Sequence, residues 1–178
     1  MHIKAVLIVG MPGSGKDEFA SVARDLGIQV INMGDIVREF TSKMGKSISE
    51  SGNIASRERE INGKDIWAIR TMERISGSLV VIEGIRNMEE IERFKKDLSV
   101  GLVVGISSGK GKRFERLLKR GRGDDPKNLE EFEKRENREL SWGIGQVLAT
   151  ADAYICNDSS IEEFRSKVME FLREHINQ

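Results

Sequence analysis

The sequence predicts an α/β fold of three layers, in which a five-stranded parallel sheet lies between helices on both faces. Two observations support this prediction. Short segments rich in branched apolar residues alternate with segments whose apolar residues recur at helical spacing, and strands that are apolar on both faces are typical of a parallel sheet covered by helices. In addition, a glycine-rich loop follows the first apolar segment directly and precedes a helical one.

The predicted strands are residues 3–9, 28–32, 78–83, 99–106 and 153–156. Helical spacing is clearest in residues 18–26 and 161–176, where apolar side chains share one face. Ser159 and Ser160 are candidate N-caps of the last helix. Residues 41–65 and 120–128 are polar, so we interpret them as inserts that move over a site, because such loops in α/β domains usually carry function.

Composition narrows the class of protein. The 178 residues contain 29 Lys and Arg against 29 Asp and Glu, so no general attraction to nucleic acid or to an anionic membrane is expected. No apolar run approaches the roughly 20 residues that span a bilayer. A single cysteine, Cys156, excludes an internal disulfide and suits a reducing compartment. With no signal peptide at the N-terminus, these features predict a cytoplasmic protein.

Residues 10–18 read GMPGSGKDE and form a candidate phosphate-binding loop. The pattern G-x-x-x-x-G-K, here Gly10 to Lys16, lies between a predicted strand and a helix, which is the context a P-loop requires. Its glycines allow backbone N–H groups to face phosphate, the helix N-terminus adds partial positive charge, and Lys16 reaches the β and γ phosphates. The predicted ATP-binding residues of the loop are Gly10, Met11, Pro12, Gly13, Ser14, Gly15, Lys16, Asp17 and Glu18.

Asp17 stands where the general motif has Ser or Thr for Mg²⁺. Two interpretations are open. Asp17 and Glu18 could repel phosphate and mark an inactive loop. Alternatively, they point away from the first helical turn, and acids elsewhere hold the metal through water. We favour the active loop, because carboxylates are favourable near a helix N-terminus and Mg²⁺ commonly keeps several waters.

The motifs resemble those of adenylate kinases. GMPGSGKDE resembles G-x-P-G-x-G-K-G-T, NMGDIVRE resembles T-G-D-x-x-R, and VVIEGIRN resembles D-G-F-P-R with one residue fewer and no proline. The resemblance implies acceptor binding by Gly34, Asp35, Arg38 and Arg86, and it makes Glu83 an acid that holds Mg²⁺ through water. Glu90 falls near the glutamine that reads adenine in that family, although a carboxylate cannot donate to adenine N1.

RFERLLKRGRGDD resembles the segment that leads into the lid of the same family. That likeness implies that Arg116 stacks on the donor base and that Arg120, Arg122 and Arg135 act with Lys16 in catalysis. It also implies one domain over residues 1–178. The core is residues 1–32, 79–120 and 141–178, the acceptor-binding insert is about 33–78, and a short lid is about 121–140.

A second family matches the C-terminal part. ADAYICNDSSIEEFRSKV resembles the closing signature of dephospho-coenzyme A kinases, which carry an acid at the position of Asp35 that acts on a ribose hydroxyl. Asp35 is therefore a candidate general base, or simply the N-cap of a helix from Ile36. The whole chain most closely resembles archaeal adenylate-kinase-like proteins.

The sequence thus predicts transfer of phosphate from Mg-ATP to a small nucleotide acceptor, with AMP first. Dephospho-coenzyme A kinase is the alternative within the same fold. A nucleotide-binding sensor or NTPase switch without transfer is the alternative from another class. Binding of nucleic acid is not expected, and oligomeric state is not predicted.

Overall fold

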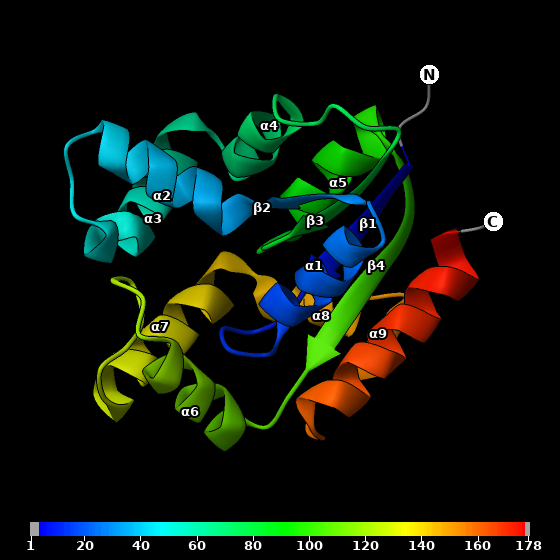
Figure 1. Cartoon of the computed structure of the whole chain (residues 1–178). Coiled ribbons are helices and arrows are strands. Elements are labelled where there is room, and N and C mark those ends of the chain that lie inside the picture. The colour runs from blue at the N-terminus through cyan, green and yellow to red at the C-terminus, as the bar shows by residue number, and fades with distance from the viewer. Residues whose placement is uncertain (1–3, 177–178) are drawn as a thin grey trace.

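A computed structural model describes residues 4–176 and contains the three predicted layers (Figure 1). The five strands are β1 (Lys4–Val9), β2 (Gln29–Asn32), β3 (Leu79–Glu83), β4 (Ser99–Ser107) and β5 (Ala153–Cys156). They pair in parallel in the order β2-β3-β1-β4-β5. The predicted fold class is confirmed, and the strand boundaries differ from the prediction by at most one residue, apart from Ile3, which lies outside the described residues.

Two groups of helices cover the sheet. The helices are α1 (Lys16–Asp25), α2 (Met33–Lys43), α3 (Ser51–Asn62), α4 (Ile66–Met72), α5 (Met88–Asp97), α6 (Lys110–Arg120), α7 (Leu129–Trp142), α8 (Ile144–Ala149) and α9 (Ile161–Ile176). Leu7 of β1 joins the apolar cluster beneath α2, α4, α5 and α8, whereas Ile8 joins the cluster beneath α1 and α9. Alternate side chains of one strand therefore fill two separate cores, as the pleat requires.

The polar segment 41–65 is largely helical, which the sequence did not indicate. It contains the end of α2, a 3₁₀ turn (Ile48–Glu50) and all of α3. Helix α3 buries Ser51, Ala55 and Arg59, so its inner face is mostly polar. A helix with such a face has little apolar periodicity, which explains why pattern analysis read a loop.

The carboxyl ends of the strands collect the candidate site at one edge of the sheet. The glycine loop follows β1, Asn32 ends β2, Glu83 ends β3, and Asn157 follows β5. Asn32 and Glu83 are direct neighbours in the register of β2 and β3. Ligands of open α/β sheets bind at this edge. Within residues 4–176, no helix has the length and apolar character that crossing a membrane would need.

Candidate functional site

The glycine loop between β1 and α1 depends on its glycines for two reasons. Gly13 and Gly15 have φ angles of +78° and +107°, which other residues adopt at a cost. A Cβ at Gly13 would lie 2.4 Å from the carbonyl oxygen of Arg113, and one at Gly15 would lie 2.0 Å from Nδ2 of Asn157. The loop is therefore packed tightly against α6 and the segment after β5.

Lys16 lies inside this loop. Its Nζ donates to the carbonyl oxygens of Gly10 at 2.6 Å and Met11 at 3.1 Å. Burial, followed by the charge of Arg86, lowers the pKa of Lys16 to about 7. A phosphate beside Lys16 would raise this pKa, because an opposite charge favours the ammonium form.

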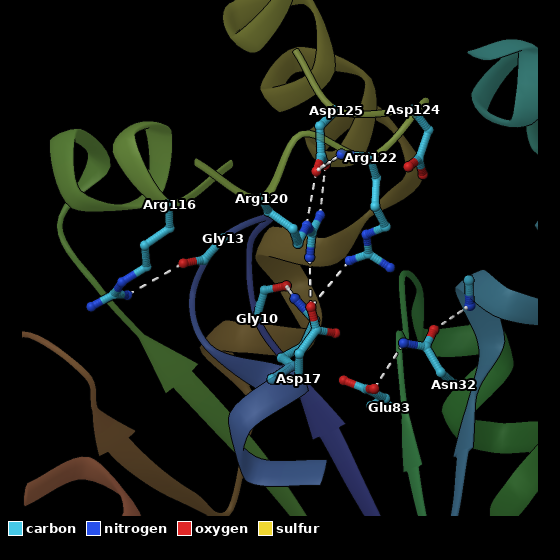
Figure 2. Close-up of polar contacts among 12 residues, drawn as sticks. Gly10, Gly13, Asp17, Asn32, Glu83, Arg116, Arg120, Arg122, Asp124 and Asp125 are labelled. Atoms are coloured by element: carbon cyan, nitrogen blue, oxygen red, sulfur yellow. Dashed lines mark hydrogen bonds and ion pairs between the residues drawn. The ribbon is translucent and has the colours of Figure 1, made fainter. Parts of the chain in front are cut away.

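Two arginines of α6 brace the loop from outside. Arg113 is buried, donates to both carboxylate oxygens of Glu136 at 2.5 and 2.8 Å, and reaches the carbonyl oxygen of Pro12. Arg116 donates to the carbonyl oxygen of Gly13 at 3.3 Å (Figure 2). Its other nitrogen donates to the carbonyl oxygen of Asn157 at 2.8 Å. Arg116 therefore holds the loop in shape, and its stacking on a donor base stays a prediction.

Glu83 is the buried acid of the site, with 2% of its surface exposed. Asn32 donates to its Oε1 at 2.8 Å, whereas its Oε2 is buried without a hydrogen-bond partner (Figure 2). Burial, followed by the charge of Asp17, raises the pKa of Glu83 to about 7. An unpaired carboxylate oxygen in this position favours a bound cation or its water.

Mg²⁺ fits Glu83 only as a water-mediated partner. In the described part of the chain, no three acidic, histidine or cysteine side chains cluster closely enough to hold a metal ion by themselves. Mg²⁺ usually keeps several waters and takes its other ligands from one or two carboxylates and substrate phosphates. The free Oε2 of Glu83 suits such a water.

Asp17 is half-exposed and contacts two arginines at the predicted lid. Its Oδ2 accepts from Arg120 at 2.6 Å and from Arg122 at 3.1 Å (Figure 2). Although burial opposes the shift, the charges of Arg122 and Arg120 lower the pKa of Asp17. The carboxylate after Lys16 is thus an anion in contact with the arginines expected to meet phosphate.

Asp125 organises the lid itself. It accepts from Nε and Nη2 of Arg120 at 2.8 and 2.6 Å, from the backbone N–H of Arg122, and from Arg135 at 3.0 Å. Although burial opposes the shift, the hydrogen bond from Arg120, with the other contacts, lowers the pKa of Asp125 to about 2. One buried carboxylate therefore positions the side chains of Arg120 and Arg135 and the backbone of Arg122.

On the acceptor side, the interpretation of Asp35 as an N-cap is wrong. Helix α2 begins at Met33, and the side chain of Asn32 caps it by accepting from the N–H groups of Gly34 and Asp35. Asp35 lies in the first turn, where its side chain is 66% exposed and pairs with Arg38 at 2.5 Å. The asparagine satisfies the helix end and Glu83 together, which leaves Asp35 without a capping role.

Arg38 and Arg86, the predicted acceptor arginines, both line the main cavity described below, and their role stays a prediction. Arg38 also donates to Asp124 at 3.2 Å, which links α2 to the lid. Arg86 pairs with Glu139 of α7, and its backbone N–H donates to Glu90 at 2.6 Å. Both oxygens of Glu90 are occupied, since Arg59 donates to the other one. Glu90, the acid near the adenine-reading position, therefore already has protein partners for both carboxylate oxygens.

One cavity of about 420 Å³ brings most of the predicted residues together. The predicted residues that line it are Pro12, Gly13, Gly15, Lys16, Asp17, Glu18, Gly34, Arg38, Glu83, Arg86, Arg116, Arg120, Arg122 and Arg135. The predicted residues that are not part of its lining are Gly10, Met11, Ser14 and Asp35. Sequence reasoning missed the remaining lining residues, which are Asn32, Gly84, Leu117, Asn157, Ser159, Ile161 and Phe164. An asparagine at the end of a predicted strand was the available signal for Asn32, and one directly after a predicted strand was the signal for Asn157.

Comparison with known proteins supports the fold and the family. The model of the AAA domain family matches residues 9–133. A UPF0200 protein of Thermoplasma volcanium is 47% identical over 173 residues, which cover 96% of this chain and 97% of that protein. A UPF0200 protein of Sulfurisphaera tokodaii is 46% identical over 172 residues, with coverage of 96% and 97%.

Two solved structures share the fold. A shikimate kinase of Acinetobacter baumannii in complex with shikimate has a TM-score of 0.62 and 16% identity, covering 98% of this chain and 94% of that one. The protein TT1252 of Thermus thermophilus has a TM-score of 0.59 and 16% identity, with 98% of both chains covered. The matches support a P-loop kinase-like nucleotide-binding domain, whereas a specific relationship to adenylate kinases remains a prediction. With its glycine loop, parallel sheet and these relatives, the chain belongs to the UPF0200 family and carries an AAA domain.

Proposed function

We propose that this protein transfers the γ-phosphate of Mg-ATP to a small nucleotide acceptor, with AMP as the first acceptor to test. The observation that carries the proposal is the charge of the main cavity, where seven cationic side chains and the buried acid Glu83 meet at the glycine loop. Phosphoryl transfer requires positioning and stabilisation of charge on the equatorial oxygens. Arginine suits this because its planar fork binds phosphate bidentately and stays charged.

Each group has a role that follows from its place. Lys16 and the loop amides hold the donor phosphates, and Arg116 lies beside them. Arg38 and Arg86 hold the acceptor, while Arg120, Arg122 and Arg135 cover the transferring group. Glu83 would hold Mg²⁺ through water, and the ion would supply neutralisation of phosphate charge.

The position of Asp35 favours a phosphate acceptor over a hydroxyl acceptor. Asp35 is exposed, paired with Arg38 and outside the lining of the main cavity. A phosphate acceptor needs no general base because its nucleophilic oxygen is already ionised. A ribose hydroxyl, as in dephospho-coenzyme A, needs a base to take its proton. We therefore expect Asp35→Asn to keep transfer within about threefold, whereas a collapse of transfer with ATP binding intact would support the dephospho-coenzyme A alternative.

A switch without transfer is the second candidate, and the contact of Asp17 with Arg120 and Arg122 favours it. If this contact persists in the presence of ATP, the two arginines are not free to stabilise transfer. Tight binding of AMP and Mg-ATP without turnover would then be observed.

Product analysis by chromatography separates these functions. Mg-ATP is incubated with AMP, CMP, UMP, GMP or dephospho-coenzyme A, using the natural protein, Lys16→Ala and the control Lys134→Ala, whose side chain is exposed on α7. We expect one acceptor to be phosphorylated far faster than the others, and only Lys16→Ala to abolish it. Slow release of ADP with every acceptor unchanged would overturn the transfer proposal.

A further inference from the structure

A second, smaller cavity of about 70 Å³ adjoins the main one and shares Arg38, Arg86 and Arg135 with it. It lies between α2, α3 and α4 on one side and α7 on the other. Its remaining wall includes Ser51, Arg59 and Arg138. None of these three was predicted to belong to a site, and their arrangement indicates what the cavity binds.

Buried hydrogen-bonding groups without partners concentrate at this cavity. Among the described residues they include Nε and Nη1 of Arg59, Nε of Arg138, Nε of Arg135 and the hydroxyl of Ser51. The opposing acceptors in the wall are Oδ1 of Asp124, which is unpaired, and Oε2 of Glu139, which accepts no hydrogen bond but is ion-paired with Arg86. Buried polar groups are ordinarily paired, and each unpaired one costs about 1–3 kcal/mol. Unpaired donors far outnumber unpaired acceptors here, so the complementary ligand is rich in hydrogen-bond acceptors.

Arg59 is held in a position that leaves in-plane N–H groups of its guanidinium available to a ligand. The residue is 9% exposed, and its Nη2 donates to Glu90 at 2.9 Å. Its guanidinium lies over the ring of Trp142, 4.4 Å from the centroid, and that of Arg138 lies 5.6 Å from the same centroid. Stacking occupies the faces of the guanidinium groups, which leaves their in-plane N–H groups for hydrogen bonds.

Charge defines the ligand further. Five arginines line the small cavity against two acids, Asp124 and Glu139, and Glu139 is paired with Arg86. Positive charge stays in excess when Glu90, behind Arg59, is counted as well. Planar arginine forks match the oxygens of a carboxylate or a phosphate. Neither water nor a neutral apolar group would balance this charge.

We infer that the cavity formed by Ser51, Arg59 and Arg138 is a subsite for an oxyanion, a carboxylate or a phosphate, that the acceptor carries in addition to the phosphate it presents for transfer. This inference rests on the proposed function, because it makes the small cavity the far part of the acceptor site. The preferred acceptor is then a nucleotide with a second anionic group, and AMP is a weaker substitute.

Gly52 provides a test that removes no charge. A Cβ at this position of α3 would lie 2.2–2.4 Å from the guanidinium atoms of Arg138. Gly52→Ala therefore displaces the end of Arg138 from the subsite. The same change favours the helix, because alanine has a higher helix propensity than glycine. Loss of binding in this variant would not come from loss of folding.

The experiment is isothermal titration calorimetry in saturating MgADP with two matched pairs of ligands. Orotidine 5′-monophosphate differs from UMP by a carboxylate, and adenosine 3′,5′-bisphosphate differs from AMP by a phosphate. We expect the second anion to tighten binding about tenfold or more in at least one pair, and the pair that responds identifies the oxyanion. Arg59→Met, Arg138→Met and Gly52→Ala should each remove this advantage while leaving MgADP binding unchanged.

Arg70→Met is the matched control. Arg70 is a stacked arginine over Phe40 and Trp67, pairs with Glu58 and lies outside the lining of both cavities, so the advantage should persist in this variant. Absence of any advantage from the second anion, or its survival in Arg59→Met and Gly52→Ala, would overturn the subsite. Failure of the natural protein to bind MgADP would instead contradict the proposed function itself.

Discussion

The two sides of this site, which the proposed function assigns to the phosphate donor and the acceptor, are built in different ways. On the donor side, backbone groups of the glycine loop are held by side chains that are themselves satisfied, such as Arg113 on Glu136 and Asn157 on the carbonyl oxygen of Ser14. On the acceptor side, arginines from α3 and α7 retain unpaired buried N–H groups, of which those of Arg59 and Arg138 are the clearest.

This difference has a physical consequence. The side chains that support the loop are paired without a ligand, although the hydroxyl of Ser14 in the loop is buried without a partner. The loop is therefore preorganised for the phosphates that every nucleotide donor shares. A wall with unpaired donors gains stability only from a ligand that pairs them, so it discriminates between acceptors. The donor side thus suits a general cofactor, and the acceptor side suits a particular substrate.

Breaking the donor loop should have the largest effect. Gly13→Ala places a Cβ 2.4 Å from the backbone of Arg113 at a φ of +78°. Backbone cannot move away as a side chain end can, so we expect a cost of about 3 kcal/mol and a loss of MgADP affinity of roughly 100-fold. Urea unfolding measures the loss of stability, and titration calorimetry measures the loss of MgADP affinity.

Gly111→Ala is the control for this change. Gly111 lies in α6, and an added Cβ would meet nothing within 4 Å, so stability should be unchanged or rise by up to about 1 kcal/mol. Equal affinities of Gly13→Ala and the natural protein would contradict the tight packing of the loop.

Removing a charge from the acceptor side should weaken binding of the acceptor without weakening binding of MgADP. Arg38→Met loses charge-assisted hydrogen bonds worth about 2 kcal/mol, so binding of the acceptor should weaken about 30-fold. MgADP affinity should stay within about twofold, because Arg38 contacts Asp35 and Asp124 rather than the loop. Arg74→Met, which removes an exposed partner of Glu39, serves as the control. Equal weakening of both ligands would argue against separate sides.

The predicted lid joins both sides, and its contribution to the free energy of unfolding should depend on pH through the ionisation of Asp125. Its pKa falls from the ordinary value of 3.8 to about 2 on folding, so its stabilisation is complete above pH 3.8 and is lost as pH falls through about 2. Asp125→Asn should lower the free energy of unfolding by about 2 kcal/mol at pH 7, and the difference from the natural protein should shrink below pH 4. Urea unfolding across this range measures it.

Glu130→Gln should leave stability unchanged at both ends of that range, because Glu130 and its partner Lys134 are exposed. A pH-independent difference for Asp125→Asn would mean that lost packing, rather than lost charge, causes the effect.

The smallest effect is expected at Asp17. Neutralising it in Asp17→Asn frees Arg120 and Arg122 from a half-exposed ion pair, so MgATP affinity should rise about threefold at most. Asp25→Asn, an exposed acid in the same helix, should change nothing. A loss of MgATP affinity in Asp17→Asn would instead indicate that this carboxylate helps to bind the metal or its waters.

Local pattern was enough to predict much of the molecule. The five strands are continuous apolar runs, and the glycine loop is a contiguous motif with its lysine, so both are visible within a few residues. The lid arginines were found through resemblance to a family. Their gathering around Asp125 was not, because that carboxylate has no distinctive spacing from the residues that it pairs with.

The amino-acid sequence by itself determined the fold class, the glycine loop and the identity of the six arginines that line the main cavity. Only the tertiary structure decided that Asn32 rather than Asp35 caps α2, that Asp17 meets the lid, and that Arg59 and Arg138 share one cavity. The reason is the range of the interactions. Strand and loop patterns arise from neighbouring residues, whereas the acceptor wall brings α3 and α7 together across many intervening residues. Nothing in either segment alone records that contact.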